Sequence, residues 1–146
     1  MWTSDLPSPP VADESTRVVR VGAVATALGL SWATMLGHNL YELPLAPTAI
    51  ENTGPLLVSV VLAIALLLRP ASRLVSAAIL GWALLNLVIG GVVSVLPLPI
   101  LPFEPEQTLD HYLAHVYYTA GQLPLVLYAL TALRRRSGTA SRGKRP

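Results

Sequence analysis

The chain has 146 residues, 53% of them apolar, but only 10 Lys and Arg residues and 8 Asp and Glu residues. All of these charges lie outside four neutral stretches, residues 21–41, 52–68, 74–103 and 111–133. Three of the stretches exceed the span of about 20 apolar residues that crosses a bilayer core, and residues 52–68 are at the short limit. The composition therefore excludes a soluble globular domain, and the lack of cysteine excludes a secreted disulfide scaffold.

The neutral stretches predict an all-α polytopic membrane protein, because a lipid-exposed backbone must satisfy its own hydrogen bonds and these runs lack the alternation of barrel strands. We expect four transmembrane helices in an antiparallel bundle over residues 18–133. A mobile N-terminal arm is expected over 1–17 and a basic cytoplasmic tail over 134–146. The helices are expected at about 18–41, 52–68, 71–96 and 109–133.

Proline and capping residues set the expected helix ends. Asn52 or Thr53 is a candidate cap for the second helix. The third helix is expected to end before the series of prolines that starts at Pro97. Pro124 lies inside the fourth helix, and we expect a kink near Ala120. The apolar loop after the third helix is expected to form an extended lid over the helix ends.

The distribution of basic residues predicts the orientation. Every Lys and Arg lies at the start of the first helix, near the junction of the second and third, or after the fourth, whereas loops 42–51 and 97–110 hold only acidic charges. Because Lys and Arg mark the cytoplasmic side, both termini are predicted to be cytoplasmic and both acidic loops to face outside the cytoplasmic (plasma) membrane. The basic tail is expected to meet anionic lipid rather than nucleic acid, because no aromatic residues are interleaved in it.

All three histidines are expected near the outer membrane surface. His38 and Glu42, and likewise His111 and His115, are four residues apart, so each pair lies on one face of its helix. If the first and fourth helices are neighbours, these four side chains converge. Three imidazoles and a carboxylate are a usual ligand set for a transition metal, and haem could be held between His38 and His115.

Further polar residues lie around this predicted site. Asn39 and Asp110 are candidates for orienting the histidine rings through hydrogen bonds. Tyr118, Gln122 and Asn86 form a possible polar path leading inward from the site. Such residues also serve as interhelical hydrogen-bond partners, and interfacial His, Tyr and Glu side chains can simply anchor helix ends, so packing and anchoring remain an alternative.

Several segments resemble small, uncharacterised four-helix membrane proteins of actinobacterial-type (high-GC) bacteria. These are GHNLYELP at 37–44, LPLP at 96–99, HYLAH at 111–115 and QLP at 122–124. The resemblance covers about residues 20–133 and implies the four-helix membrane fold. It implies no activity for any residue here.

Three functional hypotheses follow, and the sequence does not establish an enzyme. The first is a membrane protein with an outward-facing site for a transition metal or haem at His38, Glu42, His111 and His115. The second is a non-catalytic accessory subunit of a larger membrane complex, which uses the small residues of the third helix, such as Gly81 and Gly90, as its contact surface. The third is a small oligomeric transporter. The expected partners are the lipid bilayer and either other membrane subunits or further copies of the chain.

Overall fold

The computed structural model describes residues 12–43 and 45–142, and these residues form helices joined by short connections, without a strand. Helix α1 covers Ala12–Glu42, α2 covers Ile50–Leu68 and α4 covers Leu109–Arg142. Helix α3, Arg73–Leu84, continues directly into a π-helical segment η1, Leu85–Val92, and a 3₁₀ turn η2, Val93–Val95. The third span is therefore one continuous helical rod, wider than an α-helix in η1 and tighter in η2.

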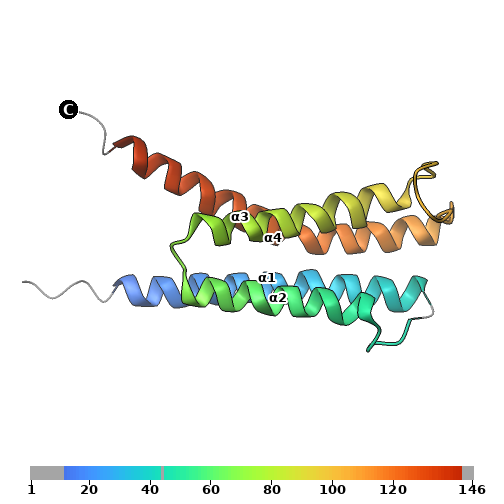
Figure 1. The fold of residues 1–146 in the computed structure, drawn as a ribbon, viewed down its shortest axis with the longest axis horizontal. Helices are drawn as coiled ribbons and strands as arrows, with labels where there is room; N and C mark the ends of the chain where they lie inside the picture. The colour runs from blue at the N-terminus through green and yellow to red at the C-terminus, as the bar shows by residue number, and fades with distance from the viewer. Residues whose placement is uncertain (1–11, 44, 143–146) are drawn as a thin grey trace, which may run out of the picture.

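The four helical rods lie side by side (Figure 1). The α1–α2 and α3–α4 connections lie at one end of the molecule, which we call the loop end. The α2–α3 connection lies at the opposite end, together with the start of α1 and the end of α4, and we call this the basic end. Helix α4 packs against both α1 and α3, and α2 packs against α1 and α3. The α1–α4 contact is the most extensive and carries the candidate site.

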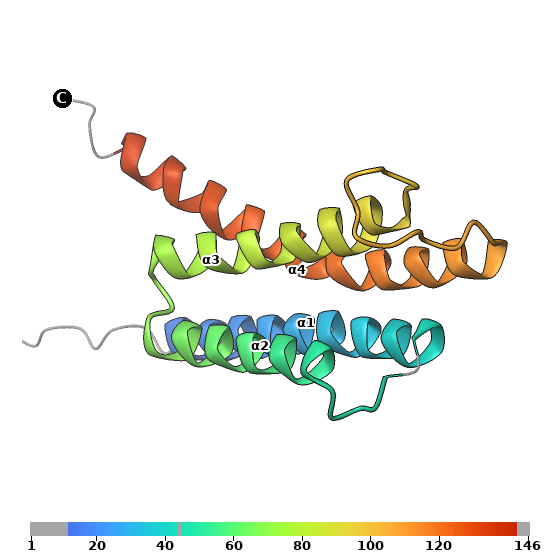
Figure 2. The same cartoon turned by 45° about the vertical axis from the view of Figure 1, so that its right-hand side comes forward.

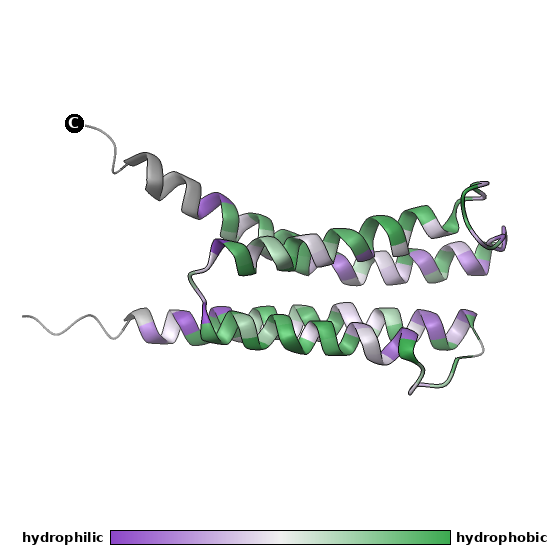
Figure 3. Ribbon diagram, in the orientation of Figure 1, coloured by the Kyte–Doolittle hydropathy of each residue, from purple (hydrophilic) through white to green (hydrophobic). Residues whose placement is uncertain are grey.

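All four rods are long and apolar enough to cross a membrane. Apolar residues run along the middle of α1, α2 and α3, whereas α4 is more hydrophilic along its half toward the loop end (Figure 3). Large apolar side chains on the outer face of α2, including Leu57, Val61 and Leu68, are more than half exposed. Such a surface is unfavourable in water and fits a protein that meets lipid on its outside.

A small apolar core joins the four helices. Its fully or nearly buried members come from all four rods: Val24, Leu28, Leu66, Ile79, Ala83, Leu125 and Ala129. Toward the loop end the helices approach more closely because glycines face them. A Cβ on Gly121 would lie 2.7 Å from the Cβ of Thr34, and one on Gly90 would lie 2.6 Å from the Tyr118 hydroxyl. Glycine at these positions brings α4 close to α1 and to η1.

The helix bounds differ from the expected ones mainly at the ends. Residues 12–17, expected in the mobile arm, form the start of α1, and α4 continues through 134–142 of the expected tail. Residues 1–11 and 143–146 lie outside the described residues. Helix α2 starts at Ile50, after Ala49, so Asn52 is not its cap but a fully buried residue inside the helix. The π-helical segment was not predicted, because its apolar residues suit any helix type.

Helix α4 changes direction along its length. Pro124 lies inside it and removes the backbone hydrogen bond to the carbonyl of Ala120. Beyond the middle of the molecule, α4 turns away from the other three rods toward the basic end (Figure 2). The proline explains a bend of this kind without any other feature.

Candidate functional site

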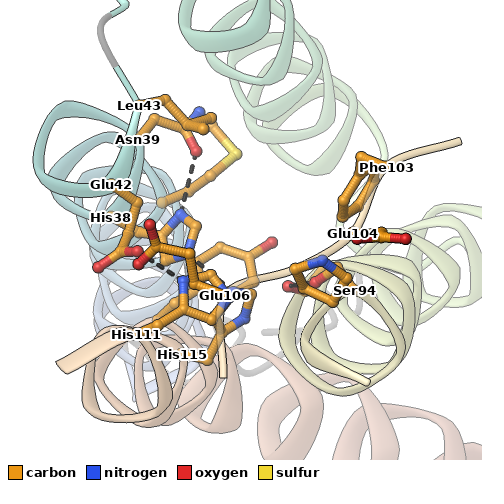
Figure 4. A pocket seen from close by; sticks show the side chains of 14 residues that line it. His38, Asn39, Glu42, Leu43, Ser94, Phe103, Glu104, Glu106, His111 and His115 are labelled. Atoms are coloured by element: carbon orange, nitrogen blue, oxygen red, sulfur yellow. Dashed lines mark hydrogen bonds and ion pairs between the residues drawn. The ribbon is translucent and has the colours of Figure 1, made fainter. Parts of the chain in front are cut away.

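The predicted site residues come from the two helices in closest contact. His38 and Glu42 lie one turn apart near the end of α1, and His111 and His115 lie one turn apart near the start of α4. Because α1 and α4 pack against each other, the four side chains gather at the loop end (Figure 4). The structure therefore brings His38 and Glu42 together with His111 and His115, which lie 69 to 77 residues further along the chain.

His38 and His115 form the centre of this cluster. Their Nε2 atoms lie 3.1 Å apart, and their ring centroids lie 4.4 Å apart in an edge-to-face arrangement. His115 is 5% exposed, and its Nδ1 is buried without a hydrogen-bond partner in the described residues. The two Nε2 atoms thus point at each other across the α1–α4 contact.

His111 and Glu42 form a second pair beside the first. Nδ1 of His111 lies 2.5 Å from Oε2 of Glu42, and both side chains are close to nine-tenths buried. The His111 ring is also 4.6 Å from the His115 ring, centroid to centroid. Among the described residues, Nε2 of His111 has no hydrogen-bond partner although it is buried. Glu42 therefore fixes the ring through one nitrogen and leaves the other available.

Asn39 forms a hydrogen bond with His38. Its Oδ1 lies 3.2 Å from Nδ1 of His38, while its Nδ2 donates a hydrogen bond to Oδ1 of Asn52. Asn52 is fully buried and donates in turn to the carbonyl of Ala46, so the chain of hydrogen bonds is anchored on the α1–α2 connection. Because the amide nitrogen of Asn39 faces Asn52, the atom that faces His38 is the amide oxygen. This oxygen must accept from the Nδ1–H of His38.

The other predicted orienting residue, Asp110, does not reach the histidines. It is exposed, and it lines a separate hollow between α1 and α4 together with His38, Tyr41 and Tyr117. No hydrogen bond joins its carboxylate to an imidazole in residues 12–43 and 45–142.

A cavity of about 600 Å³ opens beside the cluster. One wall carries the three histidines, Asn39 and Glu42, and Gly90, Ser94 and Tyr118 also line it. The α3–α4 connection also lines it, with Phe103, Glu104, Pro105 and Glu106. Phe103 and Glu104 lie across the cavity from the histidines, whereas Glu106 lies beside them (Figure 4). The loop expected to act as a lid therefore contributes to the site itself. Glu104 and Glu106 were not predicted as site residues, because their sequence pattern indicated only an acidic external loop.

The expected polar path is a set of closed hydrogen-bonded pairs. The Tyr118 hydroxyl donates to Asn86, whose amide donates to the carbonyl of Trp82. The fully buried Gln122 accepts a hydrogen bond from the Ser31 hydroxyl and donates to the Ser31 carbonyl. Of the described residues on this path, Tyr118 lines the cavity but Asn86 and Gln122 do not. The polar residues below Tyr118 thus act as packing contacts between helices.

The potential metal-ligating atoms of the cluster do not converge on a single point. As they stand, no three His, Asp or Glu side chains of the described segments are arranged to hold a metal ion. Two imidazole nitrogens face each other and a third is one ring away. The arrangement offers imidazole nitrogens to a small cation, and the Glu42 carboxylate lies beside them.

Comparison of the chain with protein-family models, with curated proteins and with solved structures finds no match. The geometry of the site is therefore the basis for inferring its function.

Proposed function

We propose that the chain is a multi-pass protein of a bacterial cytoplasmic membrane whose outward-facing cavity binds one divalent transition-metal ion. His38, His111 and His115 are the proposed ligands, each through Nε2. The observation that carries the proposal is a shortage of hydrogen-bond donors. The imidazole nitrogens of the cluster have more lone pairs than nearby N–H and O–H groups can fill.

The hydrogen bonds of two histidines assign their tautomers. Nδ1–H of His38 donates to Asn39, and Nδ1–H of His111 donates to Glu42, so Nε2 of each ring carries a lone pair. The nearby hydroxyls do not supply the missing hydrogens, because Tyr118 donates to Asn86 and Ser94 donates to the carbonyl of Gly90. At most one of the two lone pairs can accept from the ring of His115. A cation shared by the Nε2 atoms removes this deficit.

The distances are compatible with metal coordination by the first two rings. At a metal–nitrogen distance of about 2.1 Å, two nitrogens 3.1 Å apart subtend an angle of about 95° at the metal. This value lies within the range found for adjacent ligands. The third ligand, Nε2 of His111, requires its ring to turn toward the other two. Because this nitrogen has no hydrogen-bond partner among the described residues, no hydrogen bond at Nε2 has to break when the His111 ring turns.

Glu42 has a different role in this proposal from the ligand role expected from the sequence. Its carboxylate accepts from Nδ1 of His111, which is the usual position of a carboxylate that orients a metal-binding histidine and raises its basicity. Asn39 orients His38 in the same manner. Imidazole nitrogens suit zinc, copper, iron and nickel, so the donor set favours this group of metals over magnesium or calcium.

Haem fits the site less well than a metal ion. Two histidines on opposite sides of a haem iron place their nitrogens about 4 Å apart, at about 2.0 Å from the metal on each side. The 3.1 Å between the Nε2 atoms of His38 and His115 is too short for this arrangement. It also leaves no slot between the rings for a flat macrocycle.

The proposed orientation rests on charge. With an antiparallel arrangement and both termini in the cytoplasm, the basic end carries Arg17, Arg20, Arg69 and Arg73 as well as the arginines that follow residue 133. The loop end carries the acidic loops 42–51 and 97–110 and faces out. The metal site is then reached from outside, through the side lined by Glu104 and Glu106.

The two other hypotheses have less support. Transport along Tyr118, Gln122 and Asn86 requires a cavity, whereas these side chains are bonded to neighbours in the packed interior. For an accessory subunit, Gly90 is already used against α4, although Gly81 remains open on the outer face of α3. That open face is equally suited to lipid.

Metal content tests the proposal. Detergent-purified protein is incubated with Zn²⁺, desalted and analysed for bound metal, beside the variants His38→Ala and His115→Ala and the control Glu51→Gln. Glu51 is exposed near the same end but does not line the cavity. We expect about one ion per chain for the unmodified protein and the control, and loss of the ion in both histidine variants. Equal, non-stoichiometric metal in all four proteins would overturn the proposal, provided that they elute as the same folded species.

A further inference from the structure

A separate pocket lies at the basic end, between α1 and the C-terminal half of α4. It has a volume of about 230 Å³ and is lined by Arg20 of α1 and by Tyr128, Thr131, Ala132 and Arg135 of α4. Both arginines and Thr131 are exposed at its mouth, whereas Tyr128 is half-buried in its wall. The pocket is remote from the histidine cluster, so a ligand here is independent of the proposed metal site.

The position of the pocket matches the depth of lipid headgroups. Along α1, Arg20 is 18 residues from His38, or about 27 Å of helix. Along α4, Arg135 is 20 residues from His115, or about 30 Å. This is the thickness of a bilayer hydrocarbon core, so a pocket at Arg20 and Arg135 lies at one membrane surface when the histidine cluster lies at the other.

The bend in α4 accounts for the pocket. Beyond Pro124 the helix turns away from its neighbours, and α1 and α4 diverge toward the basic end (Figure 2). Two helices that stayed in contact there would press Arg20 and Arg135 together, which costs energy because both guanidinium groups are always charged. The divergence instead leaves room between them for an anionic group.

The lining has the chemistry of a phosphate site. A guanidinium presents several N–H donors in a planar fork that matches phosphate oxygens, and two arginines from different helices can approach one phosphate from two sides. The Thr131 hydroxyl lines the pocket but donates its hydrogen to the carbonyl of Tyr128, so the two arginines supply the donors for an anion. No acidic residue lines the pocket among the residues that the structure describes.

We propose that Arg20 and Arg135 bind a phosphate group in this pocket, carried either by the headgroup of an anionic phospholipid or by a small soluble phosphate ester. A ligand bound at this site contacts both α1 and the C-terminal half of α4. Basic pockets between transmembrane helices on the cytoplasmic side are suited to anionic headgroups, because the lipid acyl chains can lie along the apolar helix faces.

Native mass spectrometry of the detergent-purified, delipidated protein tests the proposal. Phosphatidylglycerol, phosphatidylcholine and glycerol 3-phosphate are titrated separately against the unmodified chain, the double variant Arg20→Gln/Arg135→Gln and the control Arg69→Gln/Arg73→Gln. The control removes the same charge at the same end, from residues that are exposed and outside the pocket. All these side chains are at the surface, so the variants are expected to fold.

We expect one tightly bound phosphate-bearing ligand per chain, with affinity reduced at least about tenfold in the pocket variant and unchanged in the control. Preference for phosphatidylglycerol over glycerol 3-phosphate identifies a lipid site, and the reverse preference identifies a soluble ester; either supports the proposal. It would be overturned if neither ligand bound more tightly than phosphatidylcholine, or if both double variants lost binding equally. Equal loss would mean that overall charge, not the pocket, attracts the ligand.

Discussion

The Nε2 atoms of His38 and His115 face each other at 3.1 Å, although the two residues are 77 positions apart in the chain. This contact belongs to the α1–α4 interface, the most extensive interface between two helices here, and lies at the end of the molecule that carries the acidic loops. A buried pair of imidazole nitrogens costs free energy unless a hydrogen or a cation lies between them. The relationship therefore links the packing of two membrane helices to the binding of a positively charged ligand.

Glu42→Gln is predicted to weaken metal binding without removing it. The substitution replaces the carboxylate that holds Nδ1 of His111, but it leaves all three proposed ligand nitrogens in place. Loss of such an orienting partner typically lowers metal affinity about 10- to 100-fold. Competition with a chromophoric chelator measures the change, and Glu51→Gln is the matched control. A Glu42→Gln protein with unchanged affinity would argue against the proposed role of the carboxylate.

Gly121→Ala is predicted to destabilise the α1–α4 contact. The added Cβ would lie 2.7 Å from the Cβ of the buried Thr34, which is closer than real Cβ contacts allow. Overpacking of this kind costs about 1–3 kcal/mol. Gly29→Ala is the control, since nothing lies within 4 Å of its added Cβ. Unfolding in mixed detergent should show the loss for Gly121→Ala alone; equal stability of both variants would contradict the close approach of α4 to α1 at this position.

Gln122→Leu is predicted to lower stability but to leave metal affinity unchanged. The variant loses both hydrogen bonds between Gln122 and Ser31, which join α4 to α1 below the cavity. Interhelical hydrogen bonds in membranes contribute about 0.6 kcal/mol on average, with a maximum near about 1.7 kcal/mol. A double-mutant cycle with Ser31→Ala measures the coupling. A folded Gln122→Leu protein that no longer binds metal would instead favour a functional polar path.

The orientation can be tested directly because the chain contains no cysteine. Single cysteines placed at Glu104, in the α3–α4 connection, and at Ala71, in the α2–α3 connection, are predicted to lie on opposite sides of the membrane. A membrane-impermeant maleimide added to intact cells should label Glu104→Cys, whereas Ala71→Cys should react after permeabilisation only. The reverse pattern would place the histidine cluster on the cytoplasmic side.

The number and approximate position of the helices could be predicted because each neutral stretch must satisfy its backbone hydrogen bonds within the membrane. That the histidines lie toward one end of their helices also followed from residue counting, since His38 and His115 are each about one bilayer thickness from basic residues. Both inferences depend on local sequence alone, and this is why they could be made without the fold.

Other features depend on tertiary packing and were missed or only conditionally predicted. The sequence alone could only assume that α1 and α4 are adjacent, and the structure shows their contact. The role of Asn52 depends on its hydrogen bond with Asn39 from another helix. Asn52 was expected to cap α2, because asparagine is a favoured residue at helix starts. The π-helical turn places Gly90 against Tyr118, and no local signal distinguishes such a segment from an ordinary helix.

A spectroscopic titration with Co²⁺ tests the central claim most directly. Cobalt replaces zinc at histidine sites, and its visible absorption reports whether nitrogen ligands surround the ion. The purified protein is predicted to saturate at one Co²⁺ per chain with a visible band that is displaced by Zn²⁺ and missing in His38→Ala and His115→Ala. If no saturable band appears in the folded, unmodified protein, the histidine cluster is not a metal site and its three rings serve the packing of α1 against α4.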